Sequence, residues 1–216
     1  MILRFLPHSP YVRKVLVAAH ETGQADTLEI VEAHVFDPET PLMAENPLGK
    51  VPALVRDDGS VLYDSTVICE WLDARHDGAR LFPEPGEARW RALRRNALGD
   101  GLGQAATWNI RERYRPDGER SEGYMAYYDR AIGRTLAALD AEATAPPAAG
   151  DAIDIGDIAV ACALSYVDFR YPDLDWRAAR PSAPGPMRSS LGRPSRRRRS
   201  GHTTVPCSRP PDGGNP

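Results

Sequence analysis

The sequence predicts a small α/β unit at the N-terminus, followed by an all-helical region. Two observations lead to this expectation. Short apolar runs alternate with helical patterns up to about residue 76, and later apolar residues keep helical spacing up to about residue 180. Residues 77–86, with two prolines and two glycines, separate the two parts as a linker. A chain of 216 residues is long enough for two units, each with its own core.

The N-terminal elements are expected in the order β-α-β-α-β-β-α. The first strand runs into a Pro-His-Ser-Pro corner, where Ser9 is placed to cap a helix and Pro10 takes its first position. Asp57-Asp58-Gly59-Ser60 is typical of a hairpin turn. Strands are predicted over residues 1–6, 28–32, 51–56 and 61–63, helices over 11–21 and 65–75, and a loop or short helix over 38–45.

Three helices are expected in the second part. Apolar residues recur at helical spacing between residues 90 and 106 and again between residues 124 and 139. A Pro/Ala/Gly-rich break at residues 146–150 follows, and Asp154-Ile155-Gly156-Asp157 then resembles a capping box. The helix that starts there is predicted to bury Ile155, Ile158, Ala159, Cys162, Ala163 and Tyr166.

Composition excludes several classes of protein. No apolar stretch is long enough to span a membrane, and the N-terminus lacks the features of a signal peptide. Cys69, Cys162 and Cys207 lie far apart and form neither a CxxC pair nor a metal-ligand spacing. We therefore expect a cytoplasmic protein without a metal, and neither nucleic acid nor a membrane as its partner.

Three short segments of the N-terminal part indicate a common chemistry. They are Ser9-Pro10-Tyr11-Val12-Arg13-Lys14, Asn46-Pro47-Leu48-Gly49-Lys50-Val51-Pro52 and Asp64-Ser65. Together they resemble the glutathione-binding domain of the glutathione S-transferases, in particular the bacterial members with a Ser-Pro-Phe/Tyr-Val-Arg-Lys corner. The resemblance covers about residues 1–180. It implies a thioredoxin-like domain over residues 1–76 and an all-helical second domain over residues 87–180.

Ser9 is the candidate catalytic residue. A free thiol has a pKa of about 8.5, so only a few per cent is thiolate at neutral pH. A hydroxyl donor at a helix N-terminus favours the thiolate, and the resemblance implies that Ser9 contacts the glutathione sulfur. The alternative is that Ser9 only caps its helix. Ser9 and Val12 replace both cysteines of a glutaredoxin-like Cys-Pro-Tyr-Cys motif, so a dithiol–disulfide cycle is not expected.

The other two segments supply further candidates for binding glutathione. The resemblance implies a cis bond before Pro52, with the main chain of Val51 paired to the cysteinyl part of the tripeptide and Lys50 near its glycyl carboxylate. Ser65 is expected to cap the next helix, whose N–H groups hold the γ-glutamyl carboxylate. Asp64 stands where the family more often has Glu or Gln, facing the γ-glutamyl ammonium. A plain strand-to-helix cap is the alternative for this pair.

The electrophile pocket is expected between the domains, on the long helix from Glu87, with Gln104, Trp108 and Arg111. Trp108 is the candidate for an apolar wall, although a lone tryptophan at helical spacing is more often part of a core. His8 and His34 lie near the proposed site. Because neither has a partner at metal-ligand spacing, we interpret both as loop residues.

Residues 181–216 differ in chemistry from the rest. Residues 1–180 hold 20 Lys and Arg against 29 Asp and Glu, whereas residues 181–216 hold seven Arg and one Asp and are rich in Pro, Ser and Gly, which predicts disorder. If the gene is read one nucleotide earlier, TCN codons for Ser182, Ser189 and Ser190 encode apolar residues, and Gly185 can become Trp. These four positions have the spacing of an apolar helix face. We therefore hypothesise a frameshifted tail. A functional basic arm at residues 196–199, for nucleic acid or anionic lipid, is the alternative.

The sequence thus favours a glutathione-dependent transferase that joins the thiolate of glutathione, as co-substrate, to a small electrophile, as in detoxification. Two alternatives stay open because a fold does not fix a reaction: a non-catalytic glutathione-binding or regulatory module, and a glutathione-dependent isomerase or dehalogenase. The resemblance also implies a homodimer. Residues 61–75 and the helix from Glu87 would carry much of its contact surface.

Overall fold

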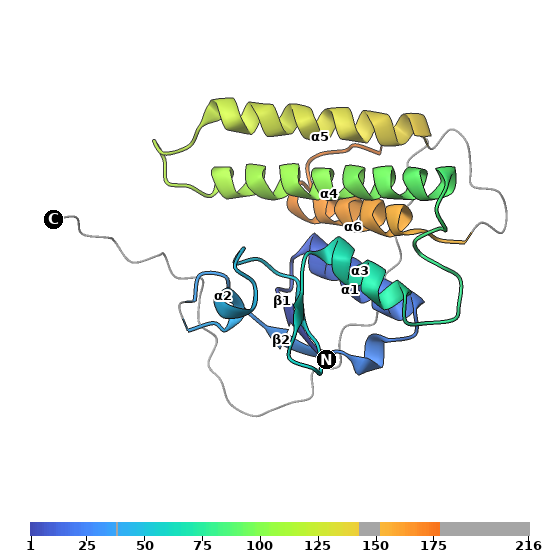
Figure 1. The fold of residues 1–216 in the computed structure, drawn as a ribbon. Helices are drawn as coiled ribbons and strands as arrows, with labels where there is room; N and C mark the ends of the chain where they lie inside the picture. The colour runs from blue at the N-terminus through green and yellow to red at the C-terminus, as the bar shows by residue number, and fades with distance from the viewer. Residues whose placement is uncertain (38, 143–151, 178–216) are drawn as a thin grey trace.

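The computed structural model describes residues 1–37, 39–142 and 152–177, and within them a mixed sheet with helices precedes a helical region (Figure 1). The predicted order of elements is confirmed, with a 3₁₀ turn in addition. The bounds are β1 (Ile2–Phe5), α1 (Pro10–Glu21), the 3₁₀ turn (Ala25–Thr27), β2 (Glu29–Glu32), α2 (Leu42–Glu45), β3 (Ala53–Val55), β4 (Val61–Leu62), α3 (Ser65–Asp73), α4 (Glu87–Arg113), α5 (Glu122–Glu142) and α6 (Ile155–Arg170). The predictions for residues 181–216, the frameshift hypothesis included, lie outside the described residues.

The sheet has four strands in the order β2-β1-β3-β4. β1 and β2 are parallel because α1 carries the chain back between them, whereas β3 runs antiparallel to both β1 and β4. Gly59, in the turn between β3 and β4, has a φ of 81°, which a residue with a side chain rarely adopts. The predicted hairpin is therefore present, and the sheet with its helices is the thioredoxin-like arrangement.

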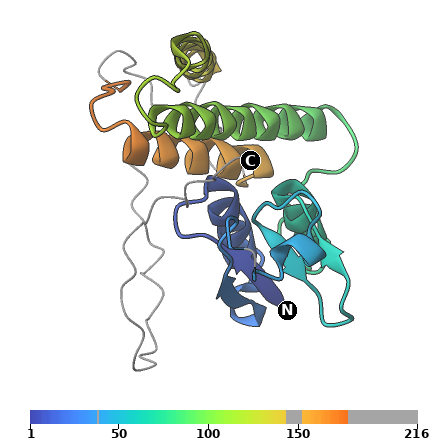
Figure 2. The same ribbon diagram turned by 90° about the vertical axis from the view of Figure 1, so that its left-hand side faces the viewer.

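The core continues from the sheet into the helical region. Leu3 of β1, Val15 of α1 and Leu54 of β3 are fully buried and belong to one apolar cluster, which also contains Ile155 and Ile158 of α6. Figures 1 and 2 show the resulting layers, with α6 lying between the helices of the N-terminal part and α4, and with α5 on the far side of α4. The two parts of the chain are thus joined through buried side chains of α1 and α6.

α4 and α6 approach each other closely at two glycines. A Cβ atom on Gly99 would lie 2.6 Å from the carbonyl carbon of Ala159, and one on Gly156 would lie 2.7 Å from the carbonyl oxygen of Ala92. The capping box predicted for α6 is present, because Asp154 and Asp157 each accept a hydrogen bond from the other's main-chain N–H. All six apolar residues predicted to be buried by this helix are buried.

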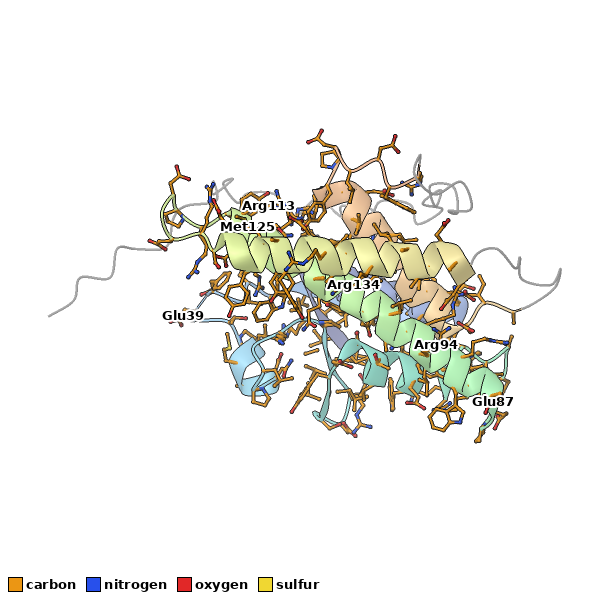
Figure 3. The ribbon with its side chains drawn as sticks, turned by 90° about the horizontal axis from the view of Figure 1, so that it is seen from above. Glu39, Glu87, Arg94, Arg113, Met125 and Arg134 are labelled. Atoms are coloured by element: carbon orange, nitrogen blue, oxygen red, sulfur yellow. The ribbon has the colours of Figure 1, made fainter. Side chains whose placement is uncertain are left out.

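α5 lies along α4 and is joined to it by polar contacts near the loop between them. Figure 3 shows Arg113 of α4 beside Met125 of α5 at that end. There Arg113 forms an ion pair with Asp129 at 3.1 Å, and Asn109 donates to the Met125 carbonyl at 3.3 Å. No helix in the described part of the chain is long and apolar enough to cross a membrane.

Candidate active site

A cavity of about 910 Å³ lies between the N-terminal part and the helical region. Its sides differ in origin, and we call them the N-terminal wall (Ser9, Lys50, Val51, Pro52, Asp64 and Ser65) and the helical wall (Gln104, Trp108, Arg111, Tyr114 and Arg170). All nine residues that the sequence indicated for a glutathione or electrophile site line this cavity: Ser9, Lys50, Val51, Pro52, Asp64, Ser65, Gln104, Trp108 and Arg111. The structure therefore brings together segments that lie up to about 100 residues apart in the sequence.

Ser9 stands at the N-terminus of α1, as predicted. Its main chain is extended, with φ −78° and ψ 120°, and its hydroxyl oxygen accepts a hydrogen bond of 3.3 Å from the main-chain N–H of Val12. Pro10 occupies the first helical position, where a missing N–H costs no helical bond. Among the described residues the Ser9 hydroxyl donates to no acceptor, so its proton is available to a ligand in the cavity.

The Val51–Pro52 bond is cis, in agreement with the family resemblance. The loop before it is held by Asn46, a buried residue whose side-chain amide donates to the Lys50 carbonyl at 2.7 Å and whose side-chain oxygen accepts from the Leu48 N–H at 3.0 Å. The Lys50 side chain is exposed, and within the described ranges it pairs with no carboxylate. These bonds fix the main chain of Val51 at the cavity edge and leave the Lys50 ammonium free.

The prediction that Ser65 caps α3 is wrong by one residue. Asp64 is the N-cap, and its carboxylate accepts a hydrogen bond of 3.0 Å from the Thr66 N–H. Ser65 is the first residue of the helix and is 1% exposed. Asp and Ser are both favoured cap residues, and here Asp64 has the extended main chain of a cap, with φ −89° and ψ −161°. Both residues still line the cavity.

On the helical wall, Trp108 is 48% exposed and is therefore not a core residue. Its ring lies 6.4 Å from that of Tyr128 of α5, centroid to centroid, which supports one edge of the side chain. Gln104 and Arg111, one turn before and one turn after it on α4, are also exposed. The Trp108 ring is thus an apolar surface that lies between the neutral amide of Gln104 and the cation of Arg111.

Two further cavity residues, Tyr11 and Asp100, were not among the predicted site residues. The Tyr11 hydroxyl donates to the Asp100 carbonyl oxygen at 3.2 Å, and burial together with the nearby Asp100 carboxylate raises the pKa of Tyr11 well above its usual range. Tyr11 is therefore a protonated donor and cannot serve as a base at neutral pH. Its position two residues after Ser9 on a helix start was the one signal that could have indicated it.

Asp100 also neutralises a buried lysine. The Lys14 ammonium, whose side chain is 1% exposed, lies 2.7 Å from a carboxylate oxygen of Asp100, whose side chain is 26% exposed. Lys14 further donates to Asn96 and Thr66, each at 3.1 Å. This cluster connects α1, α3 and α4 beneath the cavity, so it fixes the two walls relative to each other.

Two cysteines in the described part of the chain are unsuited to sulfur chemistry of their own. Cys69 and Cys162 are buried, and burial raises the pKa of each thiol to about 12. His8 and His34 line the cavity; His34 lies 3.4 Å from Glu32, and the His8 ring stacks on Phe169 at 5.0 Å. Within the described ranges no three His, Cys, Asp or Glu residues are grouped as metal ligands would be.

Comparison with known proteins decides the family. The glutathione S-transferase N-terminal domain family matches residues 8–75, and the C-terminal domain family matches residues 126–183. The uncharacterised GST-like protein YibF of Escherichia coli K12 is 30% identical over 173 residues, which cover 80% of this chain and 85% of that protein. The chain belongs to the glutathione S-transferase family.

Solved structures of other family members resemble this one. A glutathione transferase family member from Pseudomonas fluorescens Pf-5, crystallised with bound glutathione, is 45% identical over 84% of this chain and 89% of that chain, with a TM-score of 0.77. A second structure of that family member, with bound S-(propanoic acid)-glutathione, is 44% identical over the same shares, with a TM-score of 0.74. That relative binds glutathione and a glutathione conjugate in a fold that this chain shares.

Proposed function

We propose that this protein is a glutathione transferase that binds glutathione on the N-terminal wall and transfers its thiolate to a small electrophile on the helical wall. The observation that carries the proposal is the position of Ser9. Its hydroxyl lies in the cavity at the N-terminus of a twelve-residue helix, with a proton that no described residue accepts. Both the hydroxyl and the helix N-terminus favour an anion at that point.

The proposed binding mode assigns one charge of glutathione to each side of the N-terminal wall. The exposed Lys50 ammonium is free for the glycyl carboxylate, and Asp64 offers a carboxylate to the γ-glutamyl ammonium. Because Asp64 already caps α3, one of its oxygens is engaged and the other stays available. The N–H of Ser65, in the first turn of α3, is placed for the γ-glutamyl carboxylate.

The proposal assigns the reactive sulfur to glutathione, because the buried thiols of Cys69 and Cys162 are protonated at neutral pH. The relative crystallised both with glutathione and with S-(propanoic acid)-glutathione supports a site that accepts the free tripeptide and a product of sulfur alkylation. Transfer at this site requires only that the thiolate of glutathione be held beside the electrophile. That role relies on positioning and on charge stabilisation of the sulfur.

Replacing Ser9 with Ala tests the catalytic role. We expect kcat/KM with an activated aryl chloride to fall by about 10- to 100-fold, because one donor to the developing thiolate is lost. The pKa of the bound glutathione thiol, followed by the ultraviolet absorbance of the thiolate, should rise towards its free value of about 8.5. Ser9→Thr keeps both the hydroxyl and the cap and serves as the matched control.

Two outcomes would contradict this assignment. If Ser9→Ala leaves the pKa of the bound thiol and the rate unchanged, the hydroxyl only caps α1, and the expected change is a loss of about 1 kcal/mol of stability. If the wild-type protein binds glutathione tightly but turns over no member of a panel of aryl halides, enones and epoxides, it is a binding module. Turnover by the wild type separates the two cases, because only the first has a measurable rate.

We also propose a homodimer. Val67 of α3 and Trp90 of α4 are 46% and 64% exposed, and an ion pair between Glu70 and Arg89 joins the same two helices beside them. This exposed apolar surface coincides with the segments through which the family pairs its subunits. Light scattering at micromolar concentration should report a dimer, and Trp90→Glu should dissociate it, whereas a monomeric wild type would contradict the proposal.

A further inference from the structure

Two arginines of the helical wall reach the cavity without a partner carboxylate. Arg111 lies near the end of α4, Arg170 is the last residue of α6, and both line the same cavity as Ser9. Arg111 is exposed and Arg170 is half-buried. Among the residues that the structure describes, neither guanidinium forms an ion pair with Asp or Glu, and Arg170 Nε is buried without a hydrogen-bond acceptor.

Three other arginines of α4 are neutralised by carboxylates. Arg95 lies 2.9 Å from Asp157, Arg94 lies 2.7 Å from Glu142, and Arg113, two residues after Arg111, lies 3.1 Å from Asp129. None of these three arginines lines the cavity. The guanidinium groups of Arg111 and Arg170 are therefore free for a ligand in the cavity, while these three arginines join α4 to α5 and α6.

Contacts between rings place Arg170 close to the thiol corner. Its guanidinium carbon lies 4.7 Å from the centre of the Phe169 ring and 5.6 Å from that of Tyr166. Phe169 in turn stacks on His8, the residue before Ser9, at 5.0 Å and 23°. The guanidinium is thus held over two aromatic faces, one ring away from the loop that carries the catalytic candidate.

The acidic residues that line the cavity do not offset these two cations. Asp100 is paired with Lys14, and Asp64 caps α3 on the opposite wall. Glu32 lies 3.4 Å from His34, beyond the end of β2. Covering an unpaired cation with a neutral molecule is unfavourable, whereas a carboxylate forms charge-assisted and often bidentate bonds with a guanidinium.

We propose that Arg111 and Arg170 form an anion subsite that selects electrophiles carrying a carboxylate close to the reacting carbon. This inference rests on the proposed glutathione transfer and names the class of its acceptor. With a 2-haloacid, the glutathione thiolate forms a sulfur–carbon bond as the carbon–halogen bond breaks. The halide leaves with the bonding electron pair, and the carboxylate stays on the two arginines throughout.

Binding of two conjugates that differ by one group tests the subsite without turnover. S-(carboxymethyl)glutathione carries the carboxylate, and S-(carbamoylmethyl)glutathione replaces it with a neutral amide of the same shape. Calorimetry on the full chain should show the acid binding about 10- to 100-fold more tightly than the amide, as expected for charge-assisted bonds. In turnover, chloroacetate should be preferred over chloroacetamide, after correction for their uncatalysed rates with glutathione.

Matched variants assign the effect to the two arginines. Arg111→Gln with Arg170→Gln should bring the acid to the affinity of the amide, while the affinities for the amide and for glutathione itself stay within about twofold. Arg134→Gln is the control, because Arg134 is an exposed arginine of α5 (Figure 3) that does not line the cavity. It should keep the full preference for the acid.

Each other outcome overturns the inference. Equal affinity of the wild type for acid and amide excludes an anion subsite, even when glutathione binds and the proposed function holds. A loss of glutathione affinity in the double variant would assign the arginines to the tripeptide and not to the acceptor. If the double variant melts at a lower temperature but still prefers the acid, the two arginines only stabilise the C-termini of their helices. Absence of glutathione binding by the wild type would overturn the proposed function and, with it, this inference.

Discussion

The N-terminal wall of the cavity presents main-chain groups and helix caps, whereas the helical wall presents long side chains. On the first, the Ser9 hydroxyl and the Asp64 carboxylate each accept a bond from their own helix, and the loop before Val51 is held by Asn46. On the second, Trp108 and Arg111 project from α4 and are exposed. Fixed groups suit a ligand that does not vary, as proposed for glutathione, and projecting side chains can change from one relative to the next without disturbing the fold.

The two walls are joined by a buried ion pair, whose removal should have the largest effect. Asp100→Ala leaves the Lys14 ammonium, 1% exposed, without its counter-ion and should cost about 3–5 kcal/mol of unfolding free energy in urea. Lys14→Met should cost less, because the Asp100 carboxylate is 26% exposed and keeps part of its hydration. If the two variants lose the same amount, the asymmetry in burial does not govern this pair.

The packing that sets the helical wall should tolerate an added methyl group at one glycine of α4 and not at another. Gly99→Ala should cost about 1–3 kcal/mol or more, because its Cβ would lie 2.6 Å from the main chain of Ala159. Gly101→Ala meets nothing within 4 Å and should stabilise α4 by up to about 1 kcal/mol. Thermal melting of the two variants checks the opposite signs, and a shared sign would refute the close approach of α4 and α6.

On the N-terminal wall, Asp64→Asn separates charge from capping. Asn caps a helix about as well as Asp, so the unfolding free energy should change by less than about 0.5 kcal/mol. Glutathione affinity should fall about tenfold, because the γ-glutamyl ammonium loses a charged partner. Asp64→Ala is the comparison variant, which should lose both affinity and about 1 kcal/mol of stability. Unchanged glutathione affinity in Asp64→Asn would show that this carboxylate only caps α3.

On the helical wall, Trp108→Ala should have the smallest effect. The side chain is 48% exposed, so its loss should scarcely change stability, and glutathione affinity should stay within twofold. The KM for an aryl electrophile should rise about fivefold, because the electrophile loses an apolar contact with the exposed part of the indole ring. Tyr124→Ala, 62% exposed on α5 and not among the residues that line the cavity, is the control. A larger loss of glutathione affinity than of acceptor affinity would contradict the division of the walls.

Much of the fold followed from local patterns. The cap at Ser9, the capping box at Asp154 and the turn at Gly59 depend on hydrogen bonds and dihedral angles within a few residues, so the sequence alone was sufficient to place them. The nine predicted site residues all line one cavity, because the family resemblance used to predict them also implies how the strands and helices are arranged. The α3 cap was misplaced by one residue, since Asp and Ser are both good caps and stand side by side.

The sequence by itself determined the order of the elements and the caps of α1 and α6, because each depends on neighbouring residues. Only the tertiary structure decided that Lys14 is buried, since its counter-ion lies 86 residues away on another helix. It also decided that Arg170 reaches the cavity, because this depends on how α6 packs between α1 and α4 and brings Phe169 against His8. Contacts between residues far apart in the chain are set by packing, which local patterns do not encode.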